Sequence, residues 1–252
     1  MNNIKQNIMD NVTSIQSKEE YIYRFLPLRY FLQLLDNRCL FFPRVSTWED
    51  PYELFLFKQR FIDAKGIPIN VFSQSEHIFG QCWTTQRDSD ALWRIYSPDL
   101  MSVRIKTTKR MIESFIEQNQ GNGLLIKSDM VDYQAQNQIE TWLKSLSPSS
   151  INTIPLIESL FIKRNSFAHE KEFRIIIWET DFNEYGTYKS SSKYMNLPID
   201  PQKFILEVNL DPRLSQEEVN LWKPAISLRL GSSCRVSQSR LYQIKSNTIK
   251  LL

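Results

Sequence analysis

Glycine is scarce in this sequence, because only six of the 252 residues are glycine. None of the six falls in a GxGxxG or GxxxxGK(S/T) array, so the glycine-rich loops of two common phosphate-binding motifs are absent. Histidine is rarer still, and His77 and His169 are the only two. A zinc site of His and Cys ligands would need both histidines or all the cysteines at unusual spacings. We therefore expect no metal site of this kind.

Cysteines and long apolar runs are also few. Cys39, Cys82 and Cys234 are odd in number, lie far apart and form no CxxC pair. Without a signal-peptide pattern, this usage predicts a reducing, cytoplasmic setting. No apolar run approaches the roughly 18 residues of a membrane helix, so we expect no membrane partner. The net charge of +3 is too small to indicate a nucleic-acid partner by itself.

Apolar and aromatic residues are plentiful. They make up 42% and 12% of the chain, which is enough for a sizeable core. Predicted helices come early and short strands occur throughout, without repeats or a long linker. This order predicts a single α+β domain over residues 21–252, with a central mixed or split β-sheet flanked by helices. Residues 1–20 are polar and predict a flexible or helical lead-in.

Hydrophobic periodicity and turn residues place the expected elements. Expected strands cover 21–25, 39–45, 78–85, 101–106 and 203–210, with a hairpin-like pair in 124–133 and one more strand in the tail after 235. Expected helices cover 28–38, 88–96, 107–120, 211–222 and most of 134–164, and another follows Asp50-Pro51. The stretch 180–194 is expected to be a polar loop.

An acidic pair stands directly before an apolar run in FAHEKEFRIIIW, residues 167–178. The run predicts a buried strand. If the strand starts at Glu170, then Glu170, Glu172 and Arg174 share one face, because side chains alternate. One interpretation is a solvated ion pair between Glu170 and Arg174. The other is a pair of carboxylates held in a cleft, where they stabilise a positive charge or remove a proton.

Other polar residues also allow two interpretations. Arg24 lies between aromatics in YIYRF, where its guanidinium can bind a diphosphate or reach water from an edge strand. Thr84 ends IFGQCWTT and can brace a ligand or simply suit a sheet. Trp93 shares a predicted helix face with Tyr96, which favours packing. The basic pairs, which include Lys163 and Arg164, are typical of solvated faces, or of a phosphate-bearing partner if the fold brings them together.

Several short motifs occur in an order that resembles a known family. They are YRF, LFF, WEDPYE, CWTT, LWRIY, HEKEFR and LEVNLDPRL. The set resembles the bacterial domain-of-unknown-function family 2971 over most of residues 21–245. The chain departs from that pattern at Thr47-Trp48-Glu49, Leu92, Ser97 and His169, which bear on substrate details.

A second resemblance implies an enzymatic activity. An arginine in the first strand, hydroxyl residues on a middle strand and ExE before a late strand are similar to the Arg / Ser-Thr-Ser / Glu pattern of ADP-ribosyltransferases. The resemblance implies that NAD is the substrate, that catalytic Glu172 stabilises the ribosyl cation, and that Glu170 orients an acceptor. The side chains that it implies around NAD are Arg24, Tyr23, Thr84, Trp83, Trp93 and Arg174.

The implied setting is a toxin or phage-defence effector. Its acceptor would be an unknown protein or nucleic acid, and a neighbouring protein could regulate it. Two alternatives stay open. One is a metal-dependent nuclease that uses Asp50, Glu53, Glu170 and Glu172 around Mg²⁺. The other is a non-catalytic module that binds a nucleotide or a partner.

Overall fold

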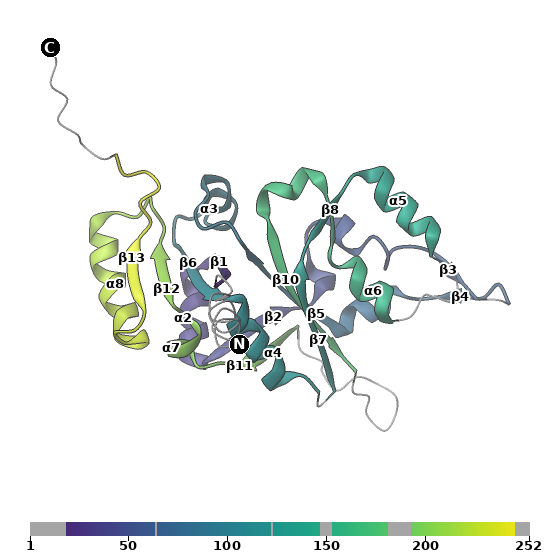
Figure 1. Cartoon of the computed structure of the whole chain (residues 1–252), viewed down its shortest axis with the longest axis horizontal. Helices are drawn as coiled ribbons and strands as arrows, with labels where there is room; N and C mark the ends of the chain where they lie inside the picture. The colour runs from purple at the N-terminus through teal and green to yellow at the C-terminus, as the bar shows by residue number, and fades with distance from the viewer. Residues whose placement is uncertain (1–18, 64, 122, 147–152, 181–192, 245–252) are drawn as a thin grey trace, which may run out of the picture.

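A seven-stranded mixed β-sheet forms the centre of the molecule (Figure 1). The computed structural model describes residues 19–63, 65–121, 123–146, 153–180 and 193–244. In sheet order, the strands are β13 (Arg235–Gln238), β12 (Glu207–Leu210), β6 (Ser102–Thr108), β1 (Tyr21–Pro27), β5 (Ile78–Thr84), β10 (Glu172–Glu179) and β7 (Leu124–Met130). Neighbours are antiparallel except β12 and β13, which are parallel. The predicted α+β class with a mixed central sheet is confirmed.

Within the described ranges, three two-stranded sheets accompany the central one. They pair β2 (Cys39–Pro43) with β11 (Tyr194–Pro198), β3 (Phe61–Ile62) with β4 (Pro68–Ile69), and β8 (Asp132–Gln134) with β9 (Ile162–Arg164). The helices are α2 (Leu28–Asn37), α3 (Asp90–Tyr96), α4 (Lys109–Asn119), α5 (Gln136–Ser145), α6 (Thr153–Ser159), α7 (Pro201–Phe204) and α8 (Gln216–Leu230). Short 3-10 helices are η1 (Val45–Thr47), η2 (Pro51–Leu54), η3 (Phe72–His77) and η5 (Asn165–Glu170). Among the described helices, none has the length and apolarity to cross a membrane.

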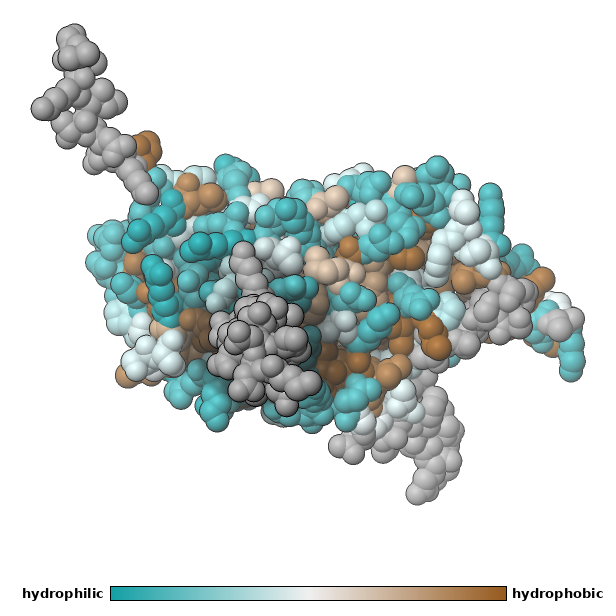
Figure 2. Space-filling view, viewed as in Figure 1, coloured by the Kyte–Doolittle hydropathy of each residue, from teal (hydrophilic) through white to brown (hydrophobic). Residues whose placement is uncertain are grey.

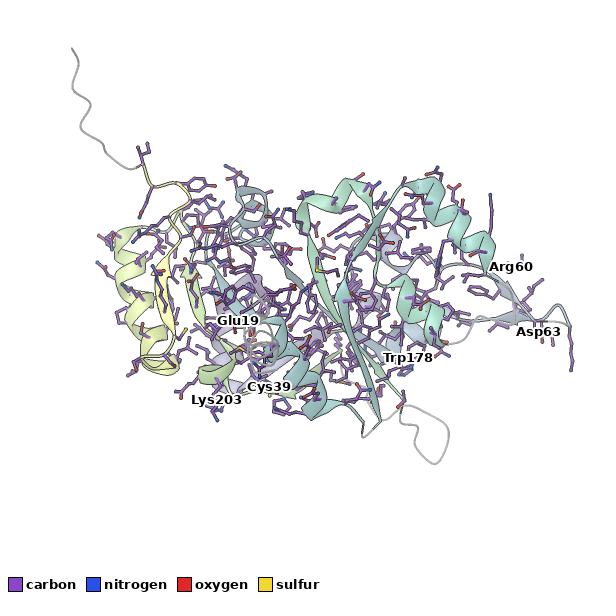
Figure 3. The ribbon with its side chains drawn as sticks, in the orientation of Figure 1. Glu19, Cys39, Arg60, Asp63, Trp178 and Lys203 are labelled. Atoms are coloured by element: carbon purple, nitrogen blue, oxygen red, sulfur yellow. The ribbon has the colours of Figure 1, made fainter. Side chains whose placement is uncertain are left out.

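Alternation along β10 separates the two larger hydrophobic clusters of the core. Ile175 and Ile177 pack with α2, α4, α7 and α8, whereas Ile176 and Trp178 pack with η2, α5 and α6. Successive strand residues point to opposite faces, so one apolar strand supplies both clusters. Figure 3 shows Trp178 at the end of β10 that is remote from Glu172. The buried strand that the sequence predicts is therefore confirmed.

The sheet is split between β1 and β5. β1 has seven residues in register with β6, and β5 has seven in register with β10. Only Tyr23 and Thr84 are in register between β1 and β5. In Figure 1, β13, β12, β6 and β1 lie in the left half and β5, β10 and β7 in the right half. The split thus runs through the middle of the molecule.

Some expected elements differ from the observed ones. Glu170 ends η5, and Lys171 with a φ of 43° separates it from β10, so the strand begins at Glu172 and not at Glu170. The predicted hairpin in 124–133 is wrong, because β7 pairs with β10 and β8 pairs with β9. That pairing also makes 162–164 a strand where a helix was expected. Only one 3-10 turn, η2, follows Asp50-Pro51. Most of the predicted polar loop (181–192) and residues 1–18 lie outside the described residues.

Gly80 of β5 is required because Trp48 lies against the sheet at this point. A Cβ atom at Gly80 would lie 2.5 Å from the Trp48 ring. We expect Gly80→Ala to lower the free energy of unfolding by about 1–3 kcal/mol through overpacking. Trp48→Phe removes the clashing ring edge, so the double variant should lose less stability than the two single losses summed. Urea unfolding of the four proteins measures this, and a Gly80→Ala variant as stable as wild type would contradict it.

Candidate functional site

A small cavity lies in the split of the sheet. β1 contributes Tyr23, Arg24 and Phe25, β5 contributes Cys82, Trp83 and Thr84, α3 contributes Leu92 and Tyr96, and η5 and β10 contribute Glu170 and Glu172. The space open to water is about 30 Å³, which is room for about two water molecules. Six of the eight residues predicted for the site therefore line one cavity.

The strand register explains why distant residues meet here. Tyr23 is in register with Thr84, and Thr84 with Glu172, so these three side chains stand in a row across β1, β5 and β10. The Thr84 hydroxyl donates a hydrogen bond of 2.6 Å to the Glu170 carbonyl oxygen. This hydrogen bond holds the end of η5 against β5 and so fixes the position of the Glu170 backbone.

A buried ionic cluster adjoins the cavity. The Lys163 ammonium lies 2.9 Å from a Glu170 oxygen and 3.3 Å from oxygens of Glu172 and Glu53. Arg174 donates to Glu172 at 2.7 Å and also to Glu53. All five side chains are less than 11% exposed. Three carboxylates therefore share two cations in a place that water hardly reaches.

This environment shifts the pKa values of the two cavity glutamates in opposite directions. Burial, and then the neighbouring Glu172 carboxylate, raise the pKa of Glu170 to about 7. Burial also raises the pKa of Glu172, but Arg174 and then Lys163 outweigh it and hold that pKa below its usual range. Near neutral pH, Glu172 is therefore charged while Glu170 exchanges a proton. Such divergence is typical of paired acid and base groups.

Arg24 faces the cavity with its charge unneutralised. Its side chain is half-buried, and no ion pair or hydrogen bond joins it to any residue that the structure describes. Burial lowers the pKa of Arg24 to about 10, which still leaves it protonated at neutral pH. A partly desolvated guanidinium without a partner is suited to bind an anion bidentately.

Trp93 and Arg174 lie behind the cavity and do not line it. Trp93 is fully buried, packs edge-on against Phe25 with centroids 4.8 Å apart, and donates its indole N–H to Asp88. Arg174 is fully buried in the ionic cluster, with its guanidinium 4.8 Å from the Trp48 ring centroid. Their predicted contact with NAD stays a prediction that would require the site to change shape.

Lys163 and Tyr96 are site residues that sequence reasoning missed. Lys163 was expected on a solvated face, but its side chain is only 7% exposed. The apolar residues that precede it, in SLFI, were the only local sign that its strand is buried. Burial, and then Glu170, raise the pKa of Tyr96, so its phenol stays neutral against the cavity.

The carboxylates proposed for a nuclease do not form a metal site. Glu53, Glu170 and Glu172 surround the Lys163 ammonium, which forms an ion pair with each of them. Asp50 pairs with Arg164 at 3.1 Å. Within the described ranges, no group of three or more His, Cys, Asp and Glu side chains is arranged to hold a metal ion. Cations of the protein itself thus take the position that the nuclease hypothesis gives to Mg²⁺.

A larger hollow of about 350 Å³ lies beside β3 and β4. Its lining is mainly apolar, with Arg60 as the one ionisable member. Figure 2 shows hydrophobic residues gathered on this right-hand half of the molecule, and Figure 3 shows Asp63 at its outer end. Without converging polar groups, this hollow lacks the chemistry of the cavity in the split.

Comparison with known proteins adds little to this geometry. No family model matches the chain, and no curated protein matches it, so family 2971 stays a resemblance. Three similar solved structures are of DarT from Thermus sp. 2.9, in complex with NAD+, with ADP-ribosylated ssDNA and with carba-NAD+. Their identities are 11%, 12% and 10%, and their TM-scores are 0.37, 0.38 and 0.36. Each alignment covers 88% of this chain and 94–96% of the other. No conclusion about function follows from likeness at this level.

The raised pKa of Glu170 predicts a pH-dependent stability. The folded chain binds this proton more tightly than the unfolded chain, whose glutamate pKa is about 4.3. The contribution is therefore present below that value and is lost as the pH rises through about 7. Glu170→Gln removes the titration, so its free energy of unfolding relative to wild type should rise by about 1–3 kcal/mol between pH 5 and pH 8.

Urea unfolding at several pH values measures this difference. The exposed Glu113→Gln on α4 is the matched control and should show no such rise. A difference between Glu170→Gln and wild type that is independent of pH would contradict the assignment.

Proposed function

We propose that this chain is an ADP-ribosyltransferase-like enzyme that cleaves the nicotinamide glycosidic bond of NAD and transfers ADP-ribose to a protein or nucleic-acid acceptor. One observation carries the proposal. A single cavity is lined by Arg24 from β1, which has no side-chain partner among the described residues, and by the charged Glu172 from β10, and these two strands flank β5 in the split sheet. NAD offers a diphosphate for the first group and a developing sugar cation for the second.

Arg24 is the anion-binding residue in this proposal. A guanidinium matches the geometry of phosphate oxygens, and partial desolvation strengthens the contact. Tyr23, Trp83 and Tyr96 flank the cavity and give it aromatic walls for a flat ring. The site needs no glycine-rich loop, which agrees with a chain that has few glycines.

Glu172 is the catalytic residue in this proposal. When the C–N bond breaks, nicotinamide takes the bonding electron pair and leaves as a neutral molecule, while positive charge develops on the ribose. A fixed carboxylate that faces this charge stabilises the transition state by several kcal/mol. The acceptor's oxygen or nitrogen then bonds to the ribose carbon and gives its proton to Glu170, whose pKa of about 7 suits a general base.

Entry of NAD requires the cavity to open. The space of about 30 Å³ is far smaller than a dinucleotide. Leu92 and Tyr96 close the cavity from α3, whereas the other lining residues lie on the strands or at the end of η5. Movement of α3 away from β1 and β5 is therefore the step that admits the ligand, and such closures are common in transferases.

The small size of the cavity also favours a second candidate function. A module that binds a nucleotide without turnover would use Arg24 and the aromatic walls, and opening would be its signal. For either function we propose a cytoplasmic setting, which suits the three free cysteines. A toxin or phage-defence role with a neighbouring regulatory protein is proposed only for the enzyme.

Two substitutions separate the enzyme from the binding module. Glu172→Gln should lower kcat for NAD cleavage about 10²–10³-fold, because the charge that stabilises the transition state is lost. Arg24→Ala should raise KM about 10–100-fold through loss of charged hydrogen bonds. Release of nicotinamide and transfer of labelled ADP-ribose to protein or nucleic acid measure these effects.

The exposed Glu113→Gln and Arg29→Ala are the matched controls, and circular dichroism checks that each variant is folded. Intact NAD with a wild-type melting shift that Arg24→Ala abolishes would favour the binding module. If wild type neither cleaves NAD nor melts differently with it, both proposals fail.

A further inference from the structure

Lys163 forms ion pairs with both carboxylates of the cavity but does not itself line the cavity. It lies on β9, and its ammonium reaches Glu53 on η2, Glu170 at the end of η5 and Glu172 at the start of β10. An ammonium group has three N–H donors, so three carboxylates can engage all of them. Its position beside the Phe167 ring, 4.6 Å from the centroid, further limits its movement.

We propose that Lys163 is the positioning residue of this site, holding Glu170 and Glu172 side by side at the cavity wall and keeping a negative charge on Glu172. Lys163 itself does not line the cavity, so it acts through these two residues. The part of the inference that concerns turnover rests on the proposed function. The part that concerns the carboxylates does not.

The contacts of the two glutamates support this assignment. Among the residues that the structure describes, Lys163 is the one cation within ion-pair distance of Glu170. Glu172 has Arg174 as a second cation, and its backbone N–H donates to the Tyr133 hydroxyl at 2.8 Å. The other ionisable groups that line the cavity or contact the cluster beside the pair are Tyr23, Arg24, Cys82, Tyr96 and Glu53. Lys163 is thus the direct ionic link between Glu170 and Glu172.

Removing the ammonium would leave three buried carboxylates with Arg174 alone. Like charges this close cannot all stay ionised out of water, so protons would bind to one or more of them. The coupled pair would then titrate at higher pH. A buried cluster that served stability alone could be replaced by apolar residues at little cost. Its position beside the cavity points instead to control of the charge there.

The test uses Lys163→Gln, the conservative Lys163→Arg, and Lys127→Gln as the matched control. Lys127 lies on β7 and also packs over an aromatic ring, that of Phe161, but it touches neither glutamate. Carbon-13 NMR of labelled glutamate carboxyls follows the titration, with Glu170→Gln and Glu172→Gln assigning the signals. In parallel, kcat and KM for NAD cleavage are measured from pH 5 to pH 9.

We expect Lys163→Gln to raise the apparent pKa values of the pair by about one unit or more. The acid limb of the kcat profile should move up by a similar amount, so kcat falls about 10-fold or more at low pH and recovers at high pH. KM should change less than about 3-fold, because Arg24 is untouched. Lys163→Arg should restore the wild-type limb, and Lys127→Gln should match wild type.

Unchanged carboxyl titrations in Lys163→Gln would overturn the inference even if wild type cleaves NAD. If wild type does not cleave NAD, the proposed function fails while the titrations still decide the role of Lys163. Should Lys163→Gln not fold, Glu53→Gln replaces it. That change removes a negative charge from the cluster and should lower the pKa of Glu170, and an unaltered Glu170 titration would overturn the inference.

Discussion

The ammonium of Lys163 among three carboxylates is the interaction on which the site depends. It ties η2, β9, η5 and β10 together where no regular backbone ladder joins all four. Burying so many charges is expensive unless each is paired, and breaking one pair in such a cluster is strongly destabilising. Arg174 completes the arrangement by bonding both Glu172 and Glu53. The acidic pair before the isoleucine strand therefore has a fixed orientation and is not a solvated strand entrance.

The split between β1 and β5 leaves a cavity beside this cluster. A continuous ladder would fill the space, but only one residue pair is in register between these strands. The three carboxylates and two cations of the cluster carry one excess negative charge when all are ionised. Arg24 also lines the cavity, with one positive charge and no ion-pair partner in the part of the chain that the structure describes. The cavity thus separates opposite charges, which suits a ligand that carries an anion at one end and becomes cationic at the other.

The same cluster assigns different tasks to two adjacent carboxylates. Glu172 forms ion pairs with both cations and stays charged, whereas Lys163 is the one described cation that pairs with Glu170, which lies against Glu172. A charged group can stabilise a cation, and a group that exchanges its proton near neutral pH can act as a base. Neither role needs a metal ion or a glycine-rich loop. The apolar clusters on both faces of β10 keep the strand that carries these groups rigid.

The sequence by itself determined the local structure. Alternation and β-branched residues placed the strand at Ile175–Trp178, and capping residues placed α3, because such preferences act within a few residues. The resemblance to the Arg / Ser-Thr-Ser / Glu pattern also named Arg24, Thr84 and Glu172, which the fold then brought to one cavity. Only the tertiary structure determined which side chains contact one another and which strands pair. It buried Lys163, separated Asp50 from Glu53, placed Trp93 behind the wall and paired β8 with β9. Glu53 and Arg174 bond across 121 residues of chain. No local pattern carries such a contact, because it depends on how the strands are ordered and packed.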